Sequence, residues 1–147
     1  MQFTDLTLRD ALRRHRERIE RGEMSIVDWD VSQVTNMSDL FKGWSDFNQP
    51  IGNWDTSNVE DMSHTFERCT SFNQPLAWNT LKVESMYEMF ARCSSFNSPL
   101  GSALLNWSFA RRGSPVQAAY RESVRSERGK HGILQIRRPS LARHGET

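Results

Sequence analysis

Apolar and polar positions recur at a nearly constant interval between Trp29 and Trp107. One copy runs from Trp54 to Trp78, WDTSNVEDMSHTFERCTSFNQPLAW, and related copies begin at Trp29 and at Trp78, so that equivalent residues lie 25 and then 24 positions apart. Such self-similarity indicates stacked units that bury their apolar side chains against neighbouring copies. The recurring apolar residues are Val34, Val59 and Val83; Met37, Met62 and Met86; Phe41, Phe66 and Phe90; and Phe47, Phe72 and Phe96.

Each copy contains a segment with helical spacing. Val59, Met62 and Phe66 occupy positions i, i+3 and i+7, the spacing of one helix face. Ser57, with a glutamate three residues later, has the pattern of a capping box, in which the serine hydroxyl accepts a hydrogen bond from a free backbone amide. The sequence therefore predicts a helix from Asn58 to about Cys69.

A short extended segment follows this helix in each copy. Residues 70–73 have turn composition, and Pro75-Leu76-Ala77-Trp78 alternates as a short strand does. The predicted fold class is α/β, a short leucine-rich-repeat-like solenoid of about three repeats of 24–25 residues, each made of helix, turn and short strand.

Three parts of the chain differ in pattern and charge. Residues 1–28 contain an apolar stripe at helical spacing, Leu8, Ala11, Leu12, His15 and Ile19, which predicts an amphipathic helix over 7–21. We interpret it as the cap of the first repeat, in preference to a membrane-surface helix, because its charges are of both signs. Residues 29–107 form the predicted solenoid, with four basic and nine acidic side chains, and residues 108–147 form a basic tail with nine basic and three acidic ones.

Stacking of the copies predicts columns of equivalent side chains. Trp29, Trp54 and Trp78 form one predicted aromatic column, with Trp107 as a possible fourth member, and the phenylalanines form two more. The recurring amides Asn48, Asn73 and Asn97 predict an inward-facing asparagine ladder that satisfies turn backbone groups, with a ligand-contacting role as the alternative.

Two further pairs have a chemical and a structural interpretation. Asp30 and Asp55 each follow a tryptophan and either pair as carboxylates for metal or acid-base chemistry or cap the start of the predicted helix; the asparagine in the third copy favours capping. Cys69 and Cys93 occupy the same repeat position, where they are either disulfide-bonded or, as we favour, buried free thiols.

These residues resemble the BspA-like leucine-rich repeat family of surface-protein repeats, long classed as a domain of unknown function. The resemblance rests on WDTSNVEDM and on FERCTSFNQPL, residues 66–76, and covers residues 24–107. It implies a curved solenoid that binds protein or glycan partners, often at microbial or parasite surfaces and often in long arrays, without catalytic residues. This chain departs from long arrays in having about three copies and in losing the motif after Trp107.

The tail allows three interpretations. Residues 115–128 could form a second cap helix before a disordered end; the whole segment could be a basic arm for nucleic acid or anionic membrane; or it could be a frame artefact without a role. The residues of the basic-arm interpretation are Arg111, Arg112, Arg121, Arg125, Arg128, Arg137 and Arg138.

The predicted function is non-catalytic protein or glycan binding through the exposed side chains of the repeats. No catalytic, cofactor or metal site is predicted, because the histidines are scattered and no phosphate-binding loop or zinc spacing is present. Nucleic acid is the less favoured partner, the chain contains no stretch long enough for a membrane span, and MQFTDLTLRD lacks the layout of a secretory signal. The predicted interaction face comprises Asp39, His64, Glu88, Lys42 and Glu67.

The aromatic column can be tested at its middle member. Trp54→Ala should lower the free energy of unfolding by about 3–5 kcal/mol, because it opens a large cavity between repeats. Urea denaturation followed by circular dichroism measures this, and a loss below about 1 kcal/mol would contradict a buried column.

Overall fold

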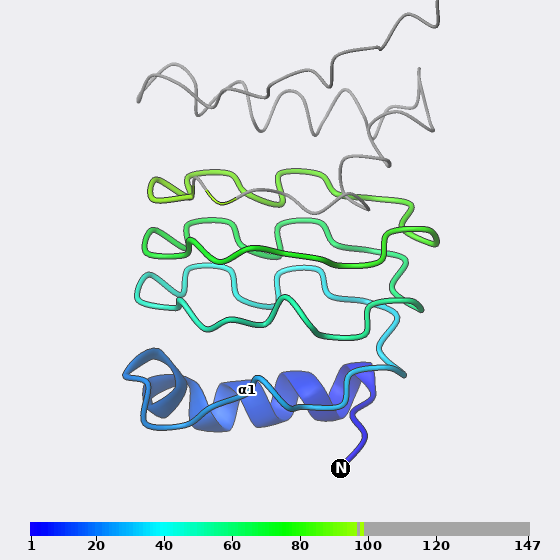
Figure 1. The fold of residues 1–147 in the computed structure, drawn as a ribbon, viewed down its shortest axis with the longest axis horizontal. Coiled ribbons are helices and arrows are strands. Elements are labelled where there is room, and N and C mark those ends of the chain that lie inside the picture. The colour runs from blue at the N-terminus through cyan, green and yellow to red at the C-terminus, as the bar shows by residue number, and fades with distance from the viewer. Residues whose placement is uncertain (97, 99–147) are drawn as a thin grey trace, which may run out of the picture.

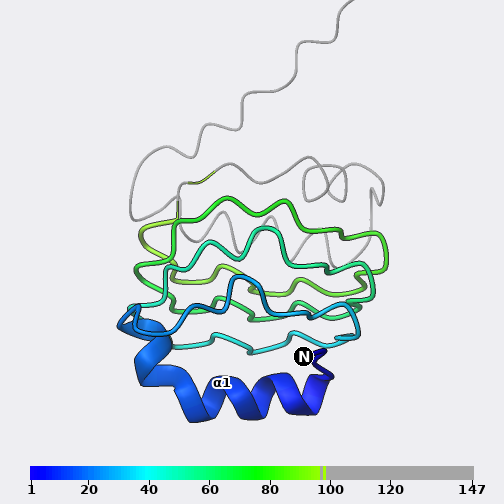
Figure 2. The ribbon, with the colours of Figure 1, turned by 60° about the horizontal axis from the view of Figure 1, so that its bottom comes forward.

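The computed structural model of the chain describes residues 1–96 and 98. Within these residues the one helix is α1, Asp5–Glu20, which lies across one end of a stack of irregular coils (Figure 1). The first coil comprises residues 29–53, the second 54–77, and the third begins at residue 78. Figure 2 shows that successive coils follow the same path, one above another, with α1 at the end of the stack beside the start of the first coil.

The α1 helix begins and ends at residues suited to those positions. Thr4 is its N-cap and forms a capping box with Thr7, in which each threonine side chain accepts from the backbone N–H of the other. Gly22 follows the helix with a φ of 71°, the left-handed conformation in which helices commonly stop. The helix thus starts two residues before its predicted position, and the buried face consists of Leu8, Leu12 and Ile19.

The coils are joined by backbone hydrogen bonds between alternate residues. Met37 and Phe41 donate their N–H groups to Asp61 and Thr65 of the second coil, over 2.8 and 2.9 Å. The second coil donates to the third in the same register, from Met62, His64, Phe66 and Arg68 to Ser85, Tyr87, Met89 and Ala91. Every other N–H is therefore committed to the next coil, and an α-helix cannot form where this occurs.

The helix predicted from Asn58 to Cys69 is consequently wrong, and this segment consists of turns. Turn hydrogen bonds connect residues three apart, from Glu67 N–H to His64 O (3.0 Å) and from Cys69 N–H to Phe66 O (3.0 Å). A series of such turns brings every third or fourth side chain inward and so imitates the helical period. The predicted short strand is also replaced: among the described residues, strand pairing is limited to isolated parallel bridges.

Left-handed residues turn the chain at two equivalent positions in each coil. Asp39, His64 and Glu88 have φ values of 57°, 56° and 50°. Gly43 and its counterparts Arg68 and Arg92 have values of 73°, 62° and 60°. Residues other than glycine adopt this backbone conformation at a cost of roughly 1–2 kcal/mol each. The interactions between stacked coils therefore compensate for local strain.

The aromatic side chains form columns through the stack. Phe66 lies between Phe41 and Phe90, with ring centroids 5.6 Å apart on both sides, and Trp54 stacks on Trp78 at 6.4 Å with an interplanar angle of 3°. Trp29 is only partly buried and stacks on Phe3 from the segment before α1, at 4.6 Å. The remaining column contains Phe47, Phe72 and Phe96 at 5.8 Å intervals, and Trp107 lies outside the described residues.

The α1 helix also supplies the polar groups that a preceding coil would provide. In later coils a carbonyl accepts two successive N–H groups, as Thr35 O does from Glu60 and Asp61 (2.7 and 3.4 Å). At the first coil the carboxylate of Asp5 replaces this carbonyl and accepts from the N–H groups of Thr35 and Asn36 over 2.8 and 3.2 Å.

The open carbonyls of the first coil are satisfied by arginines of the same helix. Arg9 donates to Ser38 O (2.8 Å) and Asn36 O (3.2 Å), and Arg16 donates to Gly43 O (2.8 Å). An uncovered row of backbone groups is a template for pairing with another chain. The helix therefore caps the stack by hydrogen bonding as well as by apolar contact.

Asp5→Ala should lower the free energy of unfolding by about 1–3 kcal/mol, because the exposed N–H of Thr35 and the partly buried N–H of Asn36 lose a charged acceptor. Burial raises the pKa of Asp5, but the hydrogen bonds from Thr35 and Asn36 outweigh it and hold the pKa below its ordinary value of 3.8. The contribution should be fully present above pH 3.8 and decline as the pH falls through the lower folded pKa. Urea denaturation at a series of pH values measures it.

Asp10→Ala is the matched control, because Asp10 lies on the same helix and its ion pair with Arg14 is exposed. It should change stability by less than about 0.5 kcal/mol. Equal losses in the two variants would show that Asp5 does not terminate the ladder.

Candidate functional site

Charged side chains from three coils meet along one flank of the stack, at the turns with left-handed residues. Asp39, His64 and Glu88 occupy the same position in successive coils, and Lys42 and Glu67 follow three residues after the first two. We call these five residues the charged row. They are the predicted interaction face, but they project from turns and not from a helix.

Each member of the charged row contacts the next. Lys42 Nζ lies 3.3 Å from Asp39 Oδ1 and 2.8 Å from Glu67 Oε2, which links the first coil to the second. His64 Nδ1 lies 2.8 Å from Glu67 Oε2 and 3.6 Å from Glu88 Oε2, which links the second coil to the third. The register of the coils thus brings together side chains that are far apart in the sequence.

Glu67 is the central and most buried member, with a side chain only 10% exposed. Its burial raises the pKa of the carboxyl group, but the hydrogen bond from Lys42, followed by that from His64, outweighs burial and lowers the pKa. The hydrogen bond to Glu67 raises the pKa of Lys42 in turn. Glu67 is therefore an anionic centre beside the ammonium group of Lys42.

Two neighbours of the charged row were missed from the sequence. Arg68 Nε lies 3.5 Å from Glu67 Oε1, and the exposed Tyr87 ring packs edge-on against His64 with centroids 5.3 Å apart. Tyr87 stands where the other copies have Ser38 and Ser63, so its departure from the repeat was a usable indication.

The asparagines connect successive copies, but their predicted orientation is wrong. Asn73 N–H donates to Asn48 Oδ1 over 2.9 Å, and Gln74 Nε2 donates to Asn48 O over 3.1 Å. Both asparagines are exposed, so this ladder runs along the surface beside the buried phenylalanines. Asn97 lies outside the described residues.

The aspartates after the tryptophans stabilise local turns. Ser32 and Ser57 donate their N–H groups to Asp30 Oδ1 (3.1 Å) and Asp55 Oδ1 (3.0 Å), and Asn79 Oδ1 accepts in the same way in the third copy (3.0 Å). An amide oxygen accepts as a carboxylate does, which explains why the position tolerates asparagine.

Both cysteines are buried free thiols, as favoured from the sequence. Cys69 Sγ donates to Phe41 O over 2.9 Å and Cys93 Sγ to Phe66 O over 2.6 Å, so each thiol contacts a carbonyl of the preceding copy. Burial raises the pKa of the Cys69 thiol, which keeps it protonated and poorly nucleophilic.

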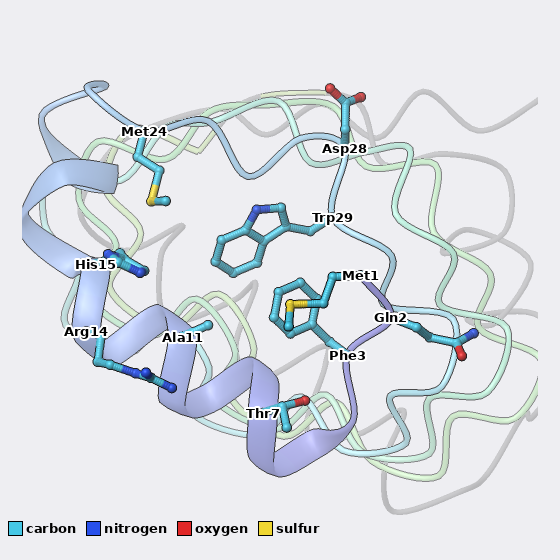
Figure 3. A pocket seen from close by; sticks show the side chains of 10 residues that line it. All are labelled: Met1, Gln2, Phe3, Thr7, Ala11, Arg14, His15, Met24, Asp28 and Trp29. Carbon is cyan, nitrogen blue, oxygen red and sulfur yellow. The ribbon is translucent and has the colours of Figure 1, made fainter.

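A hollow of about 490 Å³ lies at the end of the stack that carries α1, between this helix and residues 24–29. Figure 3 shows the Phe3 and Trp29 rings together within it, with Met24 and His15 on one side and Thr7 on another. Nothing in the described residues identifies an occupant of this hollow. The arginines of the basic-arm interpretation all lie outside the described residues.

A double-mutant cycle tests the link between coils through Glu67. Lys42→Met and Glu67→Gln should show a small but measurable stabilising coupling in the free energy of unfolding, because the lysine is partly exposed and screened by water. Urea denaturation of the four proteins measures this coupling. The same cycle with Lys82 in place of Lys42 should give no coupling to Glu67, and equal values would refute a specific pair.

Comparison with known families places these features in context. No curated protein and no solved structure matches the chain. No helix among the described residues is long and apolar enough to cross a membrane. The profile of one family, described as a Mycoplasma protein of unknown function, DUF285, matches residues 10–118. This range is more than half of the 147 residues. It includes α1 from Asp10 onward, all three copies and the start of the basic segment. The chain therefore belongs to the DUF285 family.

Proposed function

We propose that the chain is a non-catalytic interaction module, a short leucine-rich-repeat-like solenoid of the BspA-like type that binds protein or glycan through the charged row. The observation that carries the proposal is the alignment of equivalent turns, which gathers charged groups of three coils on one flank. Stacked repeats commonly present such extended surfaces for recognition.

The partial exposure of the row supports this assignment. Most recurring polar groups have a structural partner within the stack: the aspartates support turns, the asparagines link copies, and the indole N–H groups of Trp54 and Trp78 donate to buried carbonyls. Asp39 and Glu88 keep side chains 53% and 40% exposed, so they can contact a partner without loss of the fold.

An alternative places the function in the Arg-rich tail, as a basic arm for nucleic acid or anionic membrane. A further alternative is a gene fragment without a role of its own. The asymmetry of charge favours the first of these alternatives, because four basic and nine acidic groups in residues 29–107 contrast with nine basic and three acidic groups in residues 108–147.

Binding of the full chain to a printed glycan array and to a purified-protein array tests the proposal. Asp39→Asn combined with Glu88→Gln should weaken binding to any positive spot by about tenfold, or 1.4 kcal/mol. Glu60→Gln combined with Glu84→Gln removes the same charge elsewhere on these coils and should leave binding unchanged.

The tail is tested by replacing the seven arginines of the basic-arm interpretation with glutamine in the full chain. Under the proposal this variant still binds. If the tail acts as a basic arm, the variant loses binding, and binding by the wild-type chain weakens steeply as the salt concentration rises. Loss of binding in the tail variant but not in the charged-row variant would overturn the proposal.

A further inference from the structure

The charged row also contains a group of side chains with the composition of a transition-metal site, although no metal site was predicted from the sequence. His64, Glu67 and Glu88 each offer one ligand atom, and these three atoms all lie within 4.8 Å of one another. We propose that they bind a divalent transition-metal ion, with Zn²⁺ as the best fit, independently of any protein or glycan partner.

The separations of the ligand atoms suit one ion. Two ligand atoms that each lie about 2.1 Å from zinc at a tetrahedral angle are about 3.4 Å apart. His64 Nδ1 is 2.8 Å from Glu67 Oε2 and 3.6 Å from Glu88 Oε2, so the observed distances bracket that value. Small side-chain adjustments bring all three into coordination, and a fourth position remains for water.

The surrounding structure holds the ligands in place. Backbone hydrogen bonds join His64 N–H to the third coil, and the left-handed φ values of His64 and Glu88 (56° and 50°) direct equivalent side chains to the same flank. Glu67 is nearly buried, and Arg68 Nε lies 3.5 Å from its other oxygen. An ion here would connect the second and third coils.

The ligand set discriminates among metals. An imidazole with two carboxylates favours zinc, copper or nickel over magnesium and calcium, which prefer sites built only of oxygen. Lys42 competes with the ion, because its ammonium group lies 2.8 Å from the same Glu67 oxygen. Asp39 is an alternative partner for that ammonium group, at 3.3 Å, so the lysine can turn away when a metal binds.

The experiment is a titration of the full chain with Zn²⁺ in competition with a chromophoric chelator. Wild type should bind one ion at the site, and His64→Asn should weaken that binding by more than about tenfold. Asparagine suits this test because it tolerates the left-handed backbone that His64 adopts. Glu88→Gln should weaken binding similarly, and it keeps the proposal testable if the histidine variant does not fold.

Lys42→Met gives a result of opposite sign, since removal of the competing ammonium group should tighten zinc binding. His15→Asn is the matched control; His15 lies on α1, outside the site, and its replacement should leave the affinity unchanged. Thermal melting should show a zinc-dependent rise in Tm for wild type and Lys42→Met that Mg²⁺ does not reproduce. Absence of zinc binding by folded wild type, or equal affinity in His64→Asn, would overturn the proposal.

Discussion

The structure depends on the ladder of backbone hydrogen bonds that joins each coil to the next. Alternate N–H groups donate to carbonyls one copy further along the chain, as Phe41 donates to Thr65 and Phe66 to Met89. Because the ladder uses half of the backbone donors in these segments, the rest are satisfied by turns within the coil. An α-helix, which commits every donor to its own segment, is incompatible with this arrangement.

Such a ladder leaves an unpaired edge at the first coil, and the composition of α1 reflects this. An apolar stripe would be sufficient to cover the apolar end of the stack, but not to satisfy its backbone groups. Asp5 supplies the acceptor and Arg9 and Arg16 the donors that a preceding coil would have provided. These charged residues resemble an ordinary solvated helix face in the sequence, although their role is to end the ladder.

Register along the stack also explains the chemistry of the flank. A side chain and its counterparts 24 or 25 residues away become neighbours, so a change in one copy alters the environment of the next two. His64 between Asp39 and Glu88, and Tyr87 in place of a serine, produce one local cluster of histidine, carboxylates and an aromatic ring. Both the proposed interaction face and the proposed metal site follow from this alignment.

The sequence by itself determined the period, the inward positions and the place of α1, because burial selects apolar side chains wherever the chain turns inward. It also indicated a capping role for Asp30 and Asp55, but at the start of a helix, whereas both side chains accept hydrogen bonds within turns. Only the tertiary structure decided the backbone conformation, as turns and helices bring side chains inward at the same spacing, and so the Asn58–Cys69 segment was predicted wrongly. The outward position of Asn48 and the contacts of Glu67 were likewise decided by the stack, because they join residues of different coils that no local pattern connects.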